Sequence, residues 1–514
     1  MEGKNVLERG GNALDACVAM NATLTVAYPH MCGLGGDLFL LYFDATQDRV
    51  FALNGSGRAP RLATPDAFRR RGFQRIPARG PLSATVPGVV DAWQTAIDRF
   101  GSMSLRELLA PAIDVATSGI EITERLASWM ANNQADLASD AYLRKRFLSD
   151  AGSPLPAGTR LRLPELAVTL EAVAQRGADD FYRGELAAEL DRAVRNADGL
   201  LTGADLAEHR SQWVEPVAIE VGACKLYTTP PNSQGFVALQ MLMLLARWNS
   251  ARHSLESSDY IDDAVRAKTL AFSDRARYLG DPDFSDVPVD RLLSSAHLDE
   301  LSAQSLTTAE MSTLAGDTVY MAAIDGDGNS CSLIQSIYYA FGSAFSIGTT
   351  GIVLHNRAHY FTLDPRSINC LAGRKRPAHT LMASMAVQNG RPLFVVGTMG
   401  ADGQPQTVTQ VVMRILAGEH PQNAVAAPRC LSGRFLLEDP DDALLVEADF
   451  EEATCEDLRR RGHLIAEAGR LDERMGHAHA ICLRPDGLLT AGSDPRSDGA
   501  GLVVALPRTH AGGS

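Results

Sequence analysis

The run Thr318-Val-Tyr-Met-Ala-Ala-Ile324 is followed by Asp325-Gly-Asp-Gly-Asn329 and then by Ser330-Cys-Ser-Leu-Ile-Gln-Ser336. The middle segment is a strong turn signal, and the runs on either side of it predict two antiparallel strands. If Ile324 faces Ser330 without a bulge, Thr318 lies opposite Ser336 on one face of the sheet. Paired hydroxyl groups also stabilise sheets without any catalytic role, so the hairpin alone does not establish a function.

The position of Thr318 in the chain gives it a second interpretation. It follows Asp317 and the Ser-, Thr- and Ala-rich segment 285–316, which predicts a linker. A cut between Asp317 and Thr318 would leave a threonine with a free α-amino group, whose pKa is about 7.7–8.0. Such an amine can accept the hydroxyl proton, an established arrangement for a threonine nucleophile. The same hydroxyl could perform the cut by attacking the Asp317 carbonyl.

The first half of the chain predicts helices with few strands. Asn12 is expected to cap a buried helix that starts at Ala13 and ends before Pro29. We expect a strand from Leu38 to Phe43, mainly helices over residues 85–210, and strands between Val217 and Thr229. An apolar helix is expected from Phe236.

The second half has a stronger strand pattern. Strands are expected at Gly351–Leu354, Leu393–Gly397, Ala478–Leu483 and Gly501–Leu506, with helices at about 406–417 and 452–461. Helices before and after a group of antiparallel strands predict an α+β fold.

The composition is that of an ordinary globular protein with an acidic balance. The 514 residues are 45% hydrophobic and 21% charged, and the net charge is −14. We therefore expect no nucleic-acid partner and no membrane partner. The eight cysteines are scattered, which favours a reducing compartment over a disulfide framework. Together with the polar N-terminus, this leads us to expect a cytoplasmic location.

Motifs along nearly the whole chain carry a family resemblance. Among them are Arg9-Gly-Gly-Asn-Ala-Leu-Asp-Ala16, Pro29-His-Met-Cys-Gly-Leu-Gly-Gly36, Tyr278-Leu-Gly-Asp-Pro-Asp-Phe284, Gly316-Asp-Thr-Val-Tyr320 and Ser493-Asp-Pro-Arg496. In type and order they resemble the γ-glutamyltransferase family of N-terminal-nucleophile hydrolases. The resemblance implies a four-layer αββα sandwich, and a precursor cut into a large-subunit segment, 1–317, and a small-subunit segment, 318–514.

The resemblance also implies roles for individual residues. Thr318 would be the nucleophile and Ser336 its supporting hydroxyl. The Gly-Gly pair that forms the family's oxyanion hole falls on Gly400 and Ala401. Because the donors are backbone N–H groups, alanine can serve there if its backbone conformation is allowed.

The residues that bind the glutamyl group in better-known members are not kept. Their positions fall on Ser56, Tyr338, Arg357, Tyr360, His379 and Thr380, and only the hydroxyl of Thr380 is of the expected type. An ammonium would lack its carboxylate partner at Tyr360, which is costly in a buried site. Arg357 suits a carboxylate, and His379 and Arg58 could add to such a site. A structural ion pair remains the alternative for each arginine, and a structural hydrogen bond for His379.

Two classes of function are therefore open. The first is an autoprocessed threonine amidohydrolase that acts on small γ-glutamyl-type amides such as glutathione, by hydrolysis or by acyl transfer. An alternative within this first class is an oxamate-type amidohydrolase, because the sequence also resembles a divergent branch of the family that includes such enzymes. Oxamate is a carboxylate beside an amide and has no amino group. The second class is an uncleaved, non-catalytic binding protein.

Two other motifs do not indicate a cofactor site or a metal site. Gly33-Leu-Gly-Gly-Asp-Leu38 lacks the third glycine of a dinucleotide fingerprint and precedes a strand. His477-Ala-His479 has no further ligands at zinc spacing. We expect no cofactor and no metal. The expected partners are the small amide substrate and the two subunits of one precursor, and a higher oligomer is left open.

Overall fold

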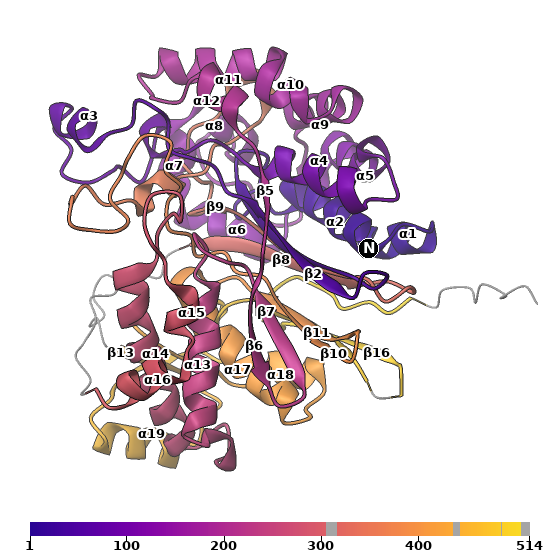
Figure 1. Ribbon diagram of the computed structural model, residues 1–514. Coiled ribbons are helices and arrows are strands. Elements are labelled where there is room, and N and C mark those ends of the chain that lie inside the picture. Colours follow the sequence, from indigo (N-terminus) through magenta and orange to yellow (C-terminus); the bar gives the residue numbers. More distant parts are fainter. Residues whose placement is uncertain (305–315, 435–442, 485, 505–514) are drawn as a thin grey trace, which may run out of the picture.

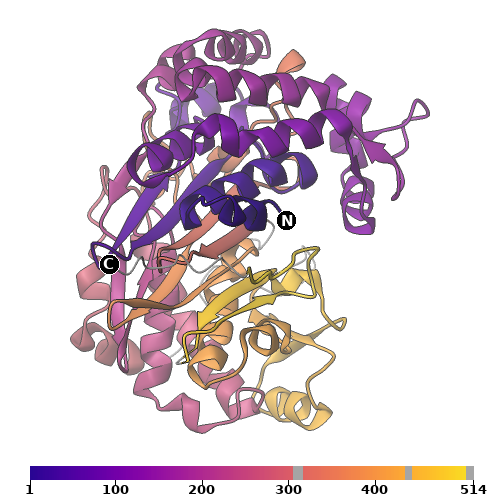
Figure 2. The same ribbon diagram turned by 90° about the vertical axis from the view of Figure 1, so that its right-hand side faces the viewer.

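The computed structural model describes residues 1–304, 316–434, 443–484 and 486–504. Two antiparallel sheets face each other in the middle of the molecule, and helices cover both outer sides (Figures 1 and 2). This is the four-layer α+β sandwich that the family resemblance implies.

The first sheet has five strands in the order β5-β2-β1-β9-β8. Their bounds are β1 Asp37–Asp44, β2 Arg49–Gly55, β5 Gln212–Val214, β8 Asp317–Ile324 and β9 Ser330–Tyr338. All the pairs are antiparallel, and β1 at the centre joins β2 to β9. Strands from both sides of the Asp317–Thr318 bond therefore share one sheet.

The second sheet has six strands in the order β16-β15-β11-β10-β7-β6. Their bounds are β6 Val217–Val221, β7 Cys224–Thr228, β10 Ser384–Gln388, β11 Arg391–Thr398, β15 Ala478–Leu483 and β16 Leu489–Ser493. Two small sheets lie apart from it: β12 Cys430–Ser432, β13 Ala443–Glu447 and β14 Leu464–Ala468, and the pair β3 Ile120–Glu121 and β4 Arg160–Leu161.

Helices α2, α4, α5 and α9 build the layer outside the five-stranded sheet, whereas α13, α17 and α18 pack on the six-stranded sheet (Figure 1). The helices of the first part of the chain are α1 Glu2–Glu8, α2 Ala13–Ala27, α3 Pro65–Arg70, α4 Val89–Phe100, α5 Leu105–Ser118, α6 Glu124–Asn132, α7 Gln134–Ser139, α8 Ala141–Phe147, α9 Pro164–Arg176, α10 Ala178–Arg183, α11 Glu185–Asn196 and α12 Gly203–Glu208. Those that follow are α13 Gly235–Arg247, α14 Ser258–Tyr278, α15 Val289–Leu292, α16 Ser295–Ser302, α17 Gln404–Leu416, α18 Pro421–Ala426 and α19 Glu452–Arg460.

The core between the sheets explains the sequence of β1. Phe39, Leu41 and Phe43 pack between the two sheets, whereas Leu38 and Leu40 pack against the helices. Successive side chains of a strand point to opposite faces, so a strand covered on both sides must be apolar throughout. Every residue of β1 is buried.

Several predicted elements are confirmed. Helix α2 starts at Ala13, and the Asn12 side chain accepts a hydrogen bond from the Asp15 N–H in a capping box. The strands predicted around Leu38–Phe43, Val217–Thr229 and Leu393–Gly397 are present as β1, β6, β7 and β11.

All eight cysteines are free. Within the described ranges, no helix combines the length and apolar character that crossing a bilayer requires.

Three predictions of elements are wrong. Segment 285–316 contains helices α15 and α16, and its residues 305–315 lie outside the described ranges. Segment 351–354 makes only isolated bridges, such as Gly35 with Leu354, because it passes the sheet end rather than extending it. Residues 501–504 form no strand, and the edge of the six-stranded sheet is β16 instead. Residues 505 and 506 lie outside the described ranges.

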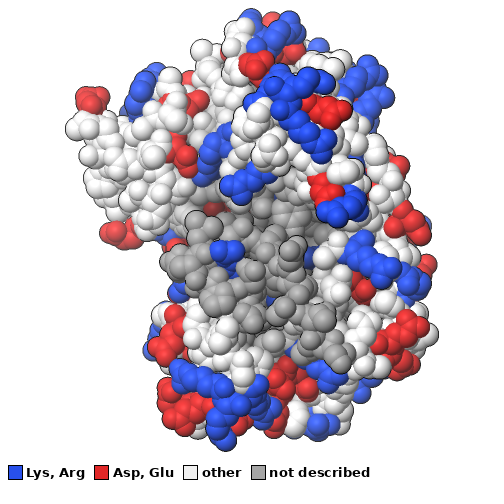
Figure 3. Space-filling view, turned by 90° about the vertical axis from the view of Figure 1, so that its left-hand side faces the viewer, with Lys and Arg blue, Asp and Glu red and all other residues white. Residues whose placement is uncertain are grey.

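Charged side chains of both signs are spread over the molecular face in Figure 3. Lys and Arg lie beside Asp and Glu on the coloured part of that face, although the sequence carries a net charge of −14. The excess of acid is therefore not visible there as a continuous acidic surface.

Gly36 directly precedes β1 and packs against Ser336 of β9. A substitution there tests how closely the two strands approach each other. A Cβ on Gly36 would lie 2.4 Å from the Ser336 carbonyl oxygen. Overpacking a core position typically costs about 1–3 kcal/mol. We expect Gly36→Ala to lower the Tm by several degrees in a thermal denaturation experiment. Gly469→Ala is the control, because a Cβ there meets nothing within 4 Å. Equal Tm values for the two variants would contradict the prediction.

Candidate active site

The β8–β9 hairpin brings Thr318 and Ser336 to the same end of the sheet. Its pairing is as predicted from Val319 with Gln335 to Ile324 with Ser330. The prediction that Thr318 lies opposite Ser336 without a bulge is wrong, because the register shifts between Asp317 and Val319. An irregularity of this kind leaves a residue unpaired and redirects the side chains beside it. Asp317 consequently pairs with Tyr338.

The shift places the Ser336 hydroxyl on the bond that precedes Thr318. Ser336 Oγ donates a short hydrogen bond to the carbonyl oxygen of Asp317, and it accepts one from the Tyr338 N–H at 2.7 Å. Thr318 and Ser336 are 3% and 2% exposed. A hydroxyl that donates to a carbonyl oxygen stabilises negative charge on that oxygen during nucleophilic attack. The Asp317–Thr318 bond therefore lies in an environment suited to its own cleavage.

The Asp317 side chain is buried at this bond. Burial, with a further contribution from the nearby charge of Glu473, raises the pKa of Asp317 to about 8, although Arg79 acts in the opposite direction. A carboxyl group taken out of water is easier to hold in its neutral form. Asp317 is therefore mostly protonated at neutral pH in the uncut chain.

Gly400 and Ala401 form a turn after β11, at the start of the short 3-10 helix η5 Ala401–Gly403. Gly400 has φ 128°, and Ala401 has φ 45°, in the left-handed region that residues other than glycine rarely adopt. A Cβ on Gly316 would lie 2.8 Å from the Ala401 Cβ and 3.2 Å from the Tyr338 ring. The segment before the Asp317–Thr318 bond thus passes between this turn and Tyr338.

Arg357 lies behind Tyr338 and is almost fully buried. It begins the 3-10 helix η4 Arg357–Tyr360, and its guanidinium lies 3.8 Å from the centre of the Tyr338 ring and 5.4 Å from that of Tyr360. Its Nη2 donates to Thr380 Oγ1 at 3.0 Å, whereas Nη1 has no hydrogen-bond partner among the described residues. Burial lowers the pKa of Arg357 from its ordinary value. A buried guanidinium with an unused donor is suited to a carboxylate.

His379 is held by a carboxylate of β1. Its Nδ1 accepts a hydrogen bond from the Leu381 N–H, so that Nε2 is the donor toward Asp37 Oδ2, 3.1 Å away. Burial, with the charge of Arg357 as the next cause, lowers the pKa of His379 to about 3. His379 is therefore a neutral structural hydrogen-bonder, the alternative that the sequence had left open.

Arg58 is likewise occupied by other groups. Its guanidinium lies 3.4 Å from Asp281 Oδ2, pairs with Asp283, and donates to the Arg374 carbonyl at 3.0 Å. The structure thus brings together Thr318, Ser336, Gly400, Ala401, Tyr338, Tyr360, Arg357 and Thr380, but it assigns Arg58 to an ion pair.

Two groups of buried polar residues were not singled out from the sequence. The Asp37 carboxylate accepts a hydrogen bond from His379 and another from the Gly57 N–H at 2.9 Å. It also lies 3.3 Å from His355 Nδ1. Gln234, Arg275 and Asp402 surround the Gly400–Ala401 turn from the other side. An acidic residue at the start of an otherwise apolar strand was the only signal for Asp37, and Arg275 resembles any charged residue of an amphipathic helix.

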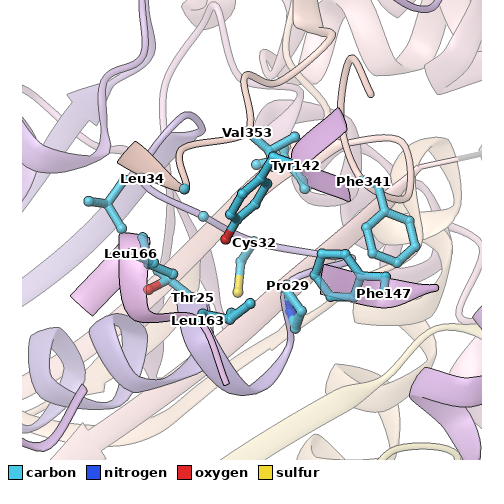
Figure 4. A pocket seen from close by; sticks show the side chains of 13 residues that line it. Thr25, Pro29, Cys32, Leu34, Tyr142, Phe147, Leu163, Leu166, Phe341 and Val353 are labelled. Atoms are coloured by element: carbon cyan, nitrogen blue, oxygen red, sulfur yellow. The ribbon is translucent and has the colours of Figure 1, made fainter. Parts of the chain in front are cut away.

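A small cavity lies elsewhere, between α2, α8, α9 and the end of β9 (Figure 4). It is mostly apolar, with Cys32, Tyr142, Phe147, Phe341 and Val353 among its lining residues. Neither Thr318 nor Arg357 lines it. Within the described ranges, no cluster of His, Cys, Asp or Glu side chains could hold a metal ion.

Comparison with known proteins identifies relatives of the whole chain. Residues 2–504 match the family model of gamma-glutamyltranspeptidase. The glutathione hydrolase-like YwrD proenzyme of Bacillus subtilis is 40% identical, over 98% of this chain and 96% of its own length. The oxamate amidohydrolase proenzyme of Klebsiella pneumoniae is 38% identical, over 96% of this chain and 94% of its own.

A solved structure agrees with this assignment. The cephalosporin acylase from Bacillus halodurans superimposes with a TM-score of 0.88 and 34% identity, covering 97% of this chain and 92% of the acylase. These relatives are enzymes, and the two curated ones are named as proenzymes, so the comparisons support the enzyme class of function rather than the non-catalytic binding protein. The chain belongs to the gamma-glutamyltranspeptidase family and is a hydrolase of that family made as a proenzyme.

Proposed function

We propose that this protein is a threonine amidohydrolase that cuts its own Asp317–Thr318 bond and then hydrolyses small amides with a carboxylate on the acyl part. The observation that carries the first half is the hydrogen bond from the Ser336 hydroxyl to the Asp317 carbonyl. It supports an attack of Thr318 Oγ on that carbonyl. The resulting ester is opened by water, which leaves segments 1–317 and 318–514 as the two subunits.

The same groups would serve the substrate after the cut. The free amine of Thr318 takes the proton of its own hydroxyl, and Oγ attacks the amide carbon. Ser336 and the N–H groups of Gly400 and Ala401 stabilise the oxyanion. The amine leaves, an acyl-enzyme forms, and water releases the acid. In the uncut chain the Gly316–Asp317 segment fills the place that the acyl group of a substrate would take.

The proposed carboxylate partner is Arg357. Its unused Nη1 donor, its burial and its position behind Tyr338 support a negatively charged acyl group there. Tyr360, with its hydroxyl donating to Asp402 at 3.0 Å, stands where the family holds the acid for an α-ammonium. This arrangement favours an oxamate-type substrate over a γ-glutamyl one. The γ-glutamyl amide remains the second candidate, supported by the 40% identity to a glutathione hydrolase-like proenzyme.

Self-cleavage gives the most direct test. Purified protein should convert to two bands on a denaturing gel, and mass spectrometry of the smaller band should find Thr318 at its N-terminus. Thr318→Ala should remain one band because it lacks the attacking oxygen. Ser336→Ala should cut at least about tenfold more slowly, since one oxyanion donor is typically worth 10²–10³ in rate. Cleavage of Thr318→Ala at wild-type speed would contradict the proposal.

The substrate is tested with the cleaved enzyme and two amides. We expect hydrolysis of oxamate and little or none of a γ-glutamyl anilide, measured as released ammonia or aniline. Hydrogen bonds to a charged group contribute about 1.5–3 kcal/mol, so Arg357→Ala should raise KM roughly 10- to 100-fold. Arg58→Ala is the matched control and should leave KM unchanged. The reverse preference would select the γ-glutamyl candidate.

The buried Asp317 predicts a pH dependence of the uncut precursor, studied in the Thr318→Ala variant. A carboxyl whose pKa is raised from 3.8 to about 8 stabilises the folded chain most at low pH. Its contribution is lost as the pH rises toward 8, by about 1.4 kcal/mol per unit, and then levels off. The Tm should therefore fall between pH 5 and 8 more steeply than in Thr318→Ala/Asp317→Asn. Parallel curves would show that Asp317 is not buried as a neutral acid.

A further inference from the structure

A buried polar network lies under the Gly400–Ala401 turn. Arg275 of α14 forms an ion pair with Asp402 of η5, in which Nη1 and Oδ1 are 2.7 Å apart. The two side chains are 8% and 0% exposed. The same Nη1 donates to Gln234 Oε1 at 2.8 Å, and the guanidinium lies 4.2 Å from the centre of the Phe272 ring. The pair keeps the pKa of Arg275 above its ordinary value in spite of burial.

The network reaches the turn through Gln234. With Oε1 fixed by Arg275, the Gln234 amide presents its Nε2 donor to two carbonyls, that of Ala401 at 3.0 Å and that of Thr380 at 2.8 Å. One side chain therefore holds both the oxyanion turn and the segment before β10, in which the Thr380 hydroxyl binds Arg357. This orientation of the amide depends on Arg275.

The network also reaches the wall of the acyl pocket. Asp402 Oδ1 accepts the Tyr360 hydroxyl at 3.0 Å as well as Arg275. The Tyr360 ring packs edge-on against Tyr338, with the ring centres 5.9 Å apart. Asp402 directly follows the proposed oxyanion donor Ala401. It therefore connects the turn to the two aromatic rings beside Arg357.

Ala401 needs such support. Its φ of 45° is unfavourable for alanine, and a free chain would leave this conformation readily. Strained residues persist only where the surroundings over-determine them. Here the carbonyl of Ala401 is held by Gln234, and the next side chain is held by Arg275 and Tyr360.

We propose that Gln234, Arg275 and Asp402 are positioning residues that fix the Ala401 N–H for the oxyanion and align it with the acyl pocket through Tyr360 and Thr380. None of the three touches the reacting atoms. The inference rests on the proposed function, because it assumes that Ala401 serves the threonine chemistry.

The test compares two buried acids beside Arg275. Asp402 forms an ion pair with Arg275, whereas Asp274 precedes it in the sequence. Asp402→Asn keeps the size of the side chain and removes its charge from the network. Asp274→Asn is the matched control. Asp274 is also buried on α14, but it binds Gln240 and His297, 2.6 Å from each, away from the turn. Both variants are purified, and Tm, the half-time of self-cleavage, and kcat and KM on the amide are measured.

We expect Asp402→Asn to slow self-cleavage and to lower kcat at least tenfold with KM changed less than threefold. Asp274→Asn should lower Tm by a similar amount and keep both rates within twofold of the wild type. Equal loss of rate in the two variants, or a loss confined to KM, would overturn the proposal. Gln234→Glu provides a second variant if Asp402→Asn does not fold: it keeps a partner for Arg275 but, when ionised, cannot donate to the two carbonyls, so it should show the same fall in kcat.

Self-cleavage separates this inference from the substrate assignment. A wild-type protein that cuts itself but hydrolyses neither amide would refute the substrate while the half-times of the variants still report on the turn. A wild-type protein that never cuts itself would refute both proposals.

Discussion

The pairing of β8 with β9 is the constraint on which the site depends. The ladder is regular from Ile324 to Val319 and then slips at Thr318. Without the slip, two hydroxyl side chains would face each other across a sheet. With it, the Ser336 hydroxyl donates to the carbonyl oxygen of Asp317, the group whose carbon Thr318 would have to attack. A change of one residue in register thus replaces a hydroxyl pair with a hydrogen bond to the carbonyl at the proposed cleavage site.

The sequence predicts the regular parts of this structure well and the irregular parts poorly. The turn residues at 325–329 and the two runs beside them were enough for the hairpin. They were not enough for the bulge, because counting paired positions assumes an unbroken ladder. The family resemblance placed Gly400, Ala401 and Arg357 in the site. It did not show that Arg357 stacks on Tyr338, or that His379 is held by Asp37, since these contacts join residues far apart in the chain.

Two of the buried charges around the site, on Asp37 and Asp402, have partners close by. Asp37 is matched with His355 and His379, and burial alone would raise its pKa, but the two imidazoles hold that pKa below its usual range. Asp402 is matched with Arg275. Arg357 is different, because one of its donors has no partner among the described residues. Leaving a buried donor unpaired is costly, and a ligand oxygen is one group that would complete the pairing of Arg357.

The strand order has a consequence for how the mature protein can be made. In the five-stranded sheet, β1 comes from the part before Thr318 and pairs with β9 from the part after it. In the six-stranded sheet, β7 and β10 are joined across the same division. Two separately synthesised pieces would each expose unpaired strand edges and half of a hydrophobic core, which are aggregation hazards. Synthesis as one chain, with scission only after folding, gives each strand its neighbour before the pieces become distinct molecules. Under the proposed cleavage, the Asp317–Thr318 peptide bond would serve as an assembly tether until the fold is complete.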